Sequence, residues 1–253
     1  MKVGIFDSGM GGLTVLKSLI DKYPNNHYIY FGDTLNLPYG NKSIEELKKL
    51  SSNIVEFMIS KHVDMIIIAC GTISSNCYSY LKEKYDVPIY DILSPTIEYL
   101  KETKLTNTGV IATSNTIKSG IFNSLTDYQI ECPLFVPLIE DGKIDSEYMK
   151  NAIMEYLNAK KIDNLVLGCT HYPLIVPKLK EILGDINYIN MGEVLANKLV
   201  LENKYYVLEL YFSKINENIR NLCLKLFDNY EMKEVWFYAR VTRSWNSKGS
   251  IKT

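Results

Sequence analysis

The sequence predicts an α/β fold with two pseudo-symmetric domains, each a mostly parallel sheet flanked by helices, and an active site in the cleft between them. Two observations predict it. Short, continuously apolar segments such as Met65–Cys70 alternate with helical patterns, which is typical of strands that helices cover on both faces. The same order of segments then begins again near residue 109. We expect residues 1–93 plus 208–253 to form the first domain and residues 94–207 the second.

Each element of the first half follows from its local pattern. Ser43 and Glu46 have the spacing of a capping box, which marks the start of a long helix. The segment Gly32–Gly40 is expected to be a loop. The expected strands are Lys2–Phe6, Tyr28–Phe31, Asp64–Ala69 and Pro88–Tyr90, and the expected helices are Leu13–Lys22, Ser43–Lys61, a helix from Cys70-Gly71-Thr72 to about Lys84, and Pro95–Glu102.

The second half repeats this plan. Its expected strands are Gly109–Ala112, which ends at Thr113-Ser114, and Leu165–Gly168, and its expected helices are Ser146–Lys160 and Leu174–Leu183. Gly4-Ile5-Phe6 and Gly109-Val110-Ile111 are candidates for the matching first strands.

Two cysteines stand at matching places in the repeat. Asp64 precedes Cys70 by six residues, and Asp163 precedes Cys169 by the same spacing. Each cysteine follows a strand, and ligands of open α/β sheets bind at the carboxyl ends of strands. Two halves that face each other therefore place the two thiols on opposite walls of one cleft. A chance likeness between two apolar strands remains the alternative at this point.

The position of these thiols also suggests reactivity. A helix start offers a positive dipole end and free N–H groups, which lower a thiol pKa from about 8.5 towards neutrality. Taken singly, either cysteine is more readily a packing residue than a reactive thiol, because cysteine is among the most buried residue types, but the matched pair favours chemistry. A single nucleophilic cysteine is the competing enzymatic interpretation, and it leaves the second cysteine unexplained. We interpret Cys77, Cys132 and Cys223 as packing residues.

Composition excludes several classes of protein. The chain has 28 basic and 29 acidic residues and a net charge of −1, so nothing favours nucleic acid or an anionic membrane as a partner. The start Met1–Gly9 has no apolar signal region, and no apolar run is long enough to span a bilayer. Five cysteines without a CxxC pair indicate a reduced, cytoplasmic setting without disulfides. His27 and His62 have no zinc-ligand spacing around them, so no metal site is expected.

Three further segments are candidates for the site. The glycine-rich segment Asp7–Gly12 lacks the spacing of nucleotide-binding loops, but such a turn at a helix start can bind a carboxylate through N–H groups. Asp7 itself can orient or deprotonate a neighbouring thiol. Pro38-Tyr39-Gly40 is either an ordinary turn or a part of the site. Glu140 is either a surface acid or a partner for His171, and spacing alone does not decide between them.

Several motifs together resemble one known family. The chain is similar to the glutamate racemases of the aspartate/glutamate racemase superfamily from residue 3 to about residue 193. The opening segment favours this branch over the aspartate racemases. The segments that carry the resemblance are Ile5–Val15, Tyr30–Thr34, Pro38–Gly40, Pro133–Leu138 and Leu167–Leu174.

The resemblance implies an activity and a set of site residues. It implies a cofactor-independent racemase that interconverts L- and D-glutamate, supplies D-glutamate for peptidoglycan and forms a homodimer. Cys70 and Cys169 are then the acid/base thiols. Asp7 assists the first, and His171 with Glu140 assists the second. The implied substrate-binding residues are Asp7, Ser8, Pro38, Tyr39, Gly40, Gly71, Thr72, Thr113, Thr116, Thr170 and His171.

The chain departs from the family pattern in three places. Gly71 stands where the family usually has an Asn that holds the substrate, so a substrate hydrogen bond is expected to be unmade and the pocket to be enlarged. Asn190 stands where an Asp is common, and residues 236–253 have no clear counterpart. Gly71 therefore leaves two alternatives open. One is a weakly active or non-catalytic paralogue that binds an acidic amino acid, and the other is a racemase of aspartate or another amino acid.

Overall fold

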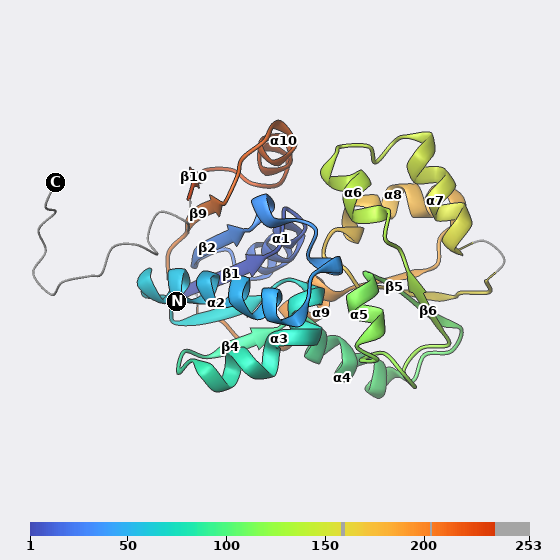
Figure 1. Cartoon of the computed structure of the whole chain (residues 1–253), viewed down its shortest axis with the longest axis horizontal. Helices are drawn as coiled ribbons and strands as arrows, with labels where there is room; N and C mark the ends of the chain where they lie inside the picture. Colours follow the sequence, from blue (N-terminus) through green and yellow to red (C-terminus); the bar gives the residue numbers. More distant parts are fainter. Residues whose placement is uncertain (158–159, 203, 236–253) are drawn as a thin grey trace, which may run out of the picture.

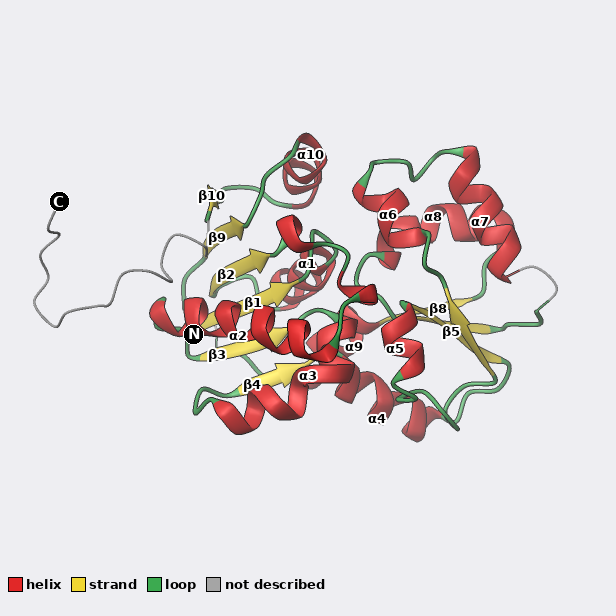
Figure 2. Cartoon of the chain, in the orientation of Figure 1, coloured by secondary structure: helices red, strands yellow, loops and turns green. Residues whose placement is uncertain are grey.

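The computed structural model describes residues 1–157, 160–202 and 204–235, and within them the strands form two parallel sheets (Figures 1 and 2). One sheet has the strand order β10-β9-β2-β1-β3-β4, and the other has the order β6-β5-β7-β8. The strands are β1 Lys2–Asp7, β2 His27–Gly32, β3 Met65–Ile68, β4 Ile89–Asp91, β5 Thr108–Ala112, β6 Tyr128–Glu131, β7 Asn164–Leu167, β8 Asn187–Asn190, β9 Val207–Phe212 and β10 Glu231–Glu234.

Helices connect the strands and cover the sheets. The α-helices are α1 Gly12–Lys22, α2 Ile44–Ser60, α3 Gly71–Lys84, α4 Leu93–Thr103, α5 Ser114–Lys118, α6 Phe135–Glu140, α7 Glu147–Leu157, α8 Val176–Leu183, α9 Met191–Lys198 and α10 Glu217–Leu226. Short 3-10 turns lie at η1 Thr34–Asn36, η2 Tyr39–Asn41 and η3 Tyr172–Ile175. No helix within these described ranges is both long and apolar enough to cross a membrane.

The internal repeat predicted from the sequence is confirmed by strand order and register. The order β2-β1-β3-β4 in the first sheet corresponds to β6-β5-β7-β8 in the second. Phe6 pairs with Ile68, and Ile111 pairs with Leu167 in the same way. The residue after each pair is also bound identically, since the N–H groups of Ala69 and Gly168 each donate over 2.8 Å to the carbonyl oxygens of Phe6 and Ile111. Cys70 and Cys169 therefore occupy equivalent positions.

Successive side chains of a strand point to opposite faces of the sheet, and both faces of the first sheet are buried. Val3 and Ile5 of β1 join a core cluster that includes Leu13, Leu16 and Leu19 of α1. Phe6 points to the other face, into a cluster with Leu47, Ile54 and Ile73 of α2 and α3. Helix α9 follows the second sheet in the chain but packs on α1. The limits of the two domains remain a prediction.

The predicted elements agree with the structure to within a few residues, with two corrections. The capping box of α2 is present, since the Ser43 hydroxyl accepts the Glu46 N–H and the Glu46 carboxylate accepts the Ser43 N–H. The expected loop 32–40 instead contains η1 and the start of η2. The helix expected from Leu174 begins as the 3-10 turn η3. The helix expected to reach Lys160 is described to Leu157, and the divergent segment 236–253 lies outside the described residues.

Candidate active site

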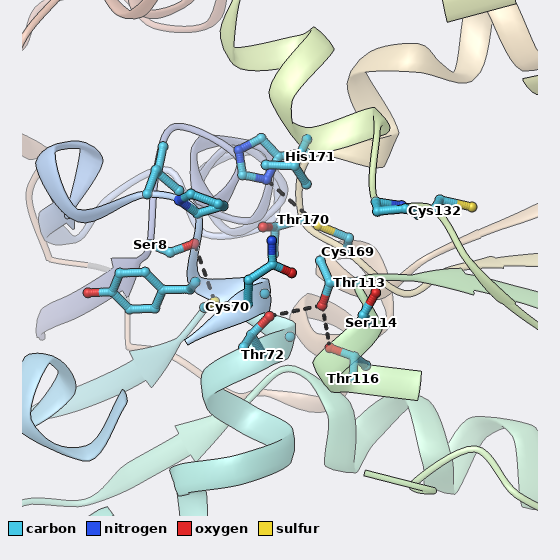
Figure 3. A pocket seen from close by; sticks show the side chains of 18 of the residues that line it. Ser8, Cys70, Thr72, Thr113, Ser114, Thr116, Cys132, Cys169, Thr170 and His171 are labelled. Carbon is cyan, nitrogen blue, oxygen red and sulfur yellow. Dashed lines mark hydrogen bonds between the residues drawn. The ribbon is translucent and has the colours of Figure 1, made fainter. Parts of the chain in front are cut away.

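A small cavity of about 50 Å³ lies where the carboxyl ends of the two sheets face each other (Figure 3). Twelve of the residues predicted from the sequence line it: Ser8, Pro38, Tyr39, Gly40, Cys70, Gly71, Thr72, Thr113, Thr116, Cys169, Thr170 and His171. Two predicted residues, Asp7 and Glu140, do not line the cavity and instead lie behind this layer. The fold thus brings together side chains that are far apart in the sequence.

Cys70 sits at the junction between β3 and the start of α3, of which it is the N-cap residue. Its side chain is almost fully buried, at 4% exposure, and its thiol donates to the Ser8 hydroxyl over 3.5 Å. Burial raises the pKa of this thiol well above its ordinary value, and the nearby Asp7 carboxylate adds to the increase. The backbone N–H of Ile73 in the first turn of α3 does lower this pKa, but burial outweighs it, so the expected shift of the Cys70 pKa towards neutrality is wrong.

Cys169 has a different partner. Its Sγ lies 3.7 Å from Nδ1 of His171, and Nε2 of the same ring lies 2.6 Å from Oε1 of Glu140. Burial by itself lowers the His171 pKa, but the hydrogen bonds to Cys169 and Glu140 outweigh it and hold this pKa well above its usual range. The imidazole is therefore held in its charged form between a thiol and a carboxylate.

Glu140, the last residue of α6, connects the two halves of the molecule. Its Oε1 also accepts the backbone N–H of Met10 over 3.0 Å, from the glycine-rich segment after β1. Its side chain is only 13% exposed. The sequence left Glu140 as either a surface acid or a partner for His171, and the structure contains the contact with His171.

Asp7 is fully buried at the end of β1. Its carboxylate accepts the N–H groups of Gly9 and Gly12 over 3.2 and 2.9 Å, and the Thr170 hydroxyl over 3.5 Å. Burial raises the Asp7 pKa, and the positive charge of His171 opposes that increase. Asp7 thus orients the glycine-rich turn and reaches across to the second half, while the Cys70 thiol bonds to Ser8.

Hydroxyl groups from both halves meet on the wall below the thiols (Figure 3). Thr72 Oγ1 lies 3.0 Å from Thr113 Oγ1, which lies 3.1 Å from Thr116 Oγ1. The neighbouring part of the wall comes from η2, where the buried Tyr39 hydroxyl donates to Asp33 Oδ2 over 2.6 Å. These neutral donors and acceptors suit a ligand that carries carboxylates and an ammonium group.

Gly71 does not enlarge the cavity as the sequence suggested. A Cβ atom placed on Gly71 would lie 2.9 Å from the Gly168 carbonyl oxygen, which is closer than real Cβ atoms come to other atoms. The backbone of the second half thus already occupies the space beside the Gly71 Cα. The absence of a side chain allows the two halves to approach each other between the two thiols.

Eight further residues that were not predicted as site residues line the cavity: Leu37, Asn41, Ser114, Cys132, Pro133, Val136, Pro137 and Gly168. Most of them are apolar or glycine, so no chemical signal marked them. The sulfur of Cys132 contacts the Ile130 carbonyl at 3.8 Å and points away from the other labelled groups, in agreement with a packing role (Figure 3). Over the part of the chain that the structure describes, no three His, Cys, Asp or Glu residues gather in a way that could hold a metal ion.

Comparisons with known proteins agree on one family. The family described as Asp/Glu/Hydantoin racemase matches residues 13–199. The chain is 38% identical to the glutamate racemase of Aquifex aeolicus over 88% of this chain and 92% of that protein. It is 37% identical to the glutamate racemase of Hydrogenobaculum sp. over 93% and 96% of the two chains. Among solved structures, the glutamate racemase from Francisella tularensis in complex with D-glutamate has 32% identity and a TM-score of 0.80, covering 92% of this chain and 97% of that one.

Proposed function

The chain belongs to the Asp/Glu/Hydantoin racemase family, and we propose that it is a glutamate racemase that interconverts L- and D-glutamate by proton transfer between two cysteines, without a cofactor. The observation that carries this proposal is the equivalent placement of Cys70 and Cys169, one from each sheet, on the lining of a single cavity. Racemisation removes a proton from one face of Cα and adds one to the other face. Two groups on opposite sides of the substrate accomplish this without turning the substrate over.

The two thiols differ in their surroundings, and this supports an assignment of the resting state. The raised pKa of Cys70 favours its thiol form. Cys169 instead has an imidazole nitrogen, Nδ1 of His171, 3.7 Å from its sulfur, which suits it to the role of the base. At rest, Cys169 is then the base and Cys70 the acid. The thiolate takes the Cα proton and becomes a thiol, while the Cys70 thiol gives its proton to the opposite face and becomes a thiolate. The reverse reaction or proton exchange with water restores the first state.

The surrounding groups stabilise the charge that develops on the substrate. Hydroxyls of Ser8, Thr72 and Thr170 line the cavity, and α3 begins at Gly71 with its free N–H groups. Preorganised donors of this kind stabilise an anionic intermediate in a site from which water is excluded. Asp7 orients the segment that carries Ser8, and Glu140 holds the His171 ring.

The wider role follows from the same proposal. The product D-glutamate serves peptidoglycan synthesis, and the reaction takes place in the cytoplasm. The five cysteines are all free, which supports a reduced compartment. The active form is a homodimer, which light scattering on the eluting peak of a sizing column tests directly.

A circular-dichroism assay on the purified chain tests the activity. We expect L- and D-glutamate to lose their optical signal, and L-aspartate to change far more slowly. Cys70→Ser and Cys169→Ser should each reduce racemisation in both directions by about 10²-fold or more, the usual contribution of a general acid or base. Retention of most wild-type activity by either variant contradicts the two-cysteine mechanism. Faster turnover of aspartate favours the alternative substrate, and no turnover despite measurable glutamate binding favours a non-catalytic paralogue.

A further inference from the structure

Asn115 of α5 reaches across the boundary between the two halves. Its side-chain amide nitrogen donates to the Lys42 carbonyl over 3.1 Å and to the Tyr39 carbonyl over 3.4 Å. Both acceptors belong to the turn η2 and its C-terminal cap in the first half, whereas α5 follows β5 in the second. The half-buried Asn115 amide of the second half thus holds both ends of η2, a turn that belongs to the first half.

The turn that Asn115 holds is a wall of the cavity. Tyr39 and Gly40 both line it. Gly40 also packs on the residue before α5, since a Cβ placed on it would lie 3.3 Å from the Thr113 Cβ. On its other side the turn is held by its own half, through the hydrogen bond from Tyr39 to Asp33. Of these two attachments, the one through Asn115 depends on how closely the two halves approach each other.

The position of the turn gives this contact a function. Tyr39 and Gly40 line the same cavity as Cys70 and Cys169. A substrate placed between the two thiols therefore meets a wall whose position depends on the hydrogen bonds from Asn115.

We propose that Asn115 is a positioning residue that holds the Tyr39–Gly40 wall against the bound substrate. The proposal rests on the function given above, with glutamate as the substrate. Asn115 acts through η2 and leaves both thiols untouched. A neutral hydrogen bond contributes a factor of about 2 to 12, so loss of the two bonds should raise KM for glutamate about tenfold while kcat stays within about twofold.

Two substitutions separate the hydrogen bonds from the packing of the side chain. Asn115→Ala removes both, whereas Asn115→Asp keeps the size of the side chain and turns a carboxylate oxygen towards the two carbonyls. We expect KM to rise in both variants, and at least as much in the Asp variant. Asn164→Ala is the matched control, because the Asn164 amide also donates to a backbone carbonyl, that of Thr106 over 2.8 Å, but does so at the far end of β7. Its KM should remain that of the wild type.

Hydrogen exchange gives a second readout that does not need turnover. The amide of Lys42, which donates to the Tyr39 carbonyl, and its neighbours in residues 39–42 should exchange faster in Asn115→Asp than in the wild-type chain or in the control. Wild-type KM together with unchanged exchange in Asn115→Asp overturns the proposal, as does a fall in kcat without a change in KM. If the wild-type chain fails to racemise glutamate, the proposed function fails, while the exchange measurement still decides the role of Asn115.

Discussion

Oε1 of Glu140 lies 2.6 Å from Nε2 of His171 and also accepts the backbone N–H of Met10, so one carboxylate oxygen joins the imidazole beside Cys169 to the glycine-rich turn of the other half. The charge of His171 and the closure of the two halves therefore depend on the same side chain.

Replacement of Glu140 by Gln should lower the His171 pKa, because the charged partner is lost while the size of the side chain is kept. A histidine whose pKa is raised on folding stabilises the folded protein. For His171 this stabilisation is complete at pH values below the ordinary pKa of about 6.5, and it disappears as the pH rises through the raised pKa. The variant should therefore be less stable than the wild type by about 1–3 kcal/mol at pH 6, and the difference should shrink at alkaline pH. The basic limb of its pH–rate profile should move to lower pH. Superimposable profiles would argue against the pairing.

Asp7→Asn separates stability from activity. The raised pKa of Asp7 means that its ionised form is unfavourable in the folded protein, and this cost grows as pH rises above the ordinary value of about 3.9. At pH 7 the Asn variant should have a Tm at or above that of the wild type, with the difference shrinking as pH falls towards 4. Its racemase activity should fall about 10²-fold. A large loss of Tm at pH 7 would contradict this explanation of the buried carboxylate.

The difference between the two thiols should be visible by alkylation. At pH 7 iodoacetamide should modify Cys169 faster than Cys70, because the thiolate is the reactive form and burial favours the thiol form of Cys70. Cys77 is a suitable internal control, since burial raises the pKa of its thiol to about 11. Mass spectrometry of the digested chain measures all three sites in one sample. Faster labelling of Cys70 would reverse the assigned resting state.

Gly71→Ala tests the close approach between the halves. The new methyl group would lie 2.9 Å from the Gly168 carbonyl oxygen, so the backbone must shift. Overpacking of this kind costs about 1–3 kcal/mol. We expect a lower Tm and at least a tenfold loss of kcat/KM, and Gly71→Asn should be no better although it restores the residue that is usual in the family. A gain of activity in Gly71→Asn would show instead that the missing side chain limits turnover.

Much of the fold could be predicted because its signals are local. Apolar strands followed by helix starts gave the positions of Cys70 and Cys169, and the repeated spacing from Asp64 and Asp163 gave their equivalence. The register of the two sheets agrees with that repeat.

The remaining features depend on contacts between segments that are distant in the sequence, which no local pattern contains. Cys70 is buried in a core cluster that includes Phe6 and Ile54, and this burial reverses the expected direction of its pKa. The contact of Gly71 with the Gly168 backbone and the reach of Asn115 to η2 join segments that are distant in the sequence. The apolar wall that includes Val136 carries no titratable group by which it could have been recognised.

Racemisation of L-glutamate in D₂O, sampled in its first few per cent of conversion, tests the two-cysteine mechanism most directly. Chiral separation followed by mass spectrometry reports the isotope at Cα in each enantiomer. If one thiol removes the proton and the other, already equilibrated with solvent, donates to the opposite face, the newly formed D-glutamate contains deuterium at Cα while the remaining L-glutamate keeps its protium. Newly formed D-glutamate that retains protium, or L-glutamate that gains deuterium as fast as product forms, would indicate a single base and contradict the mechanism.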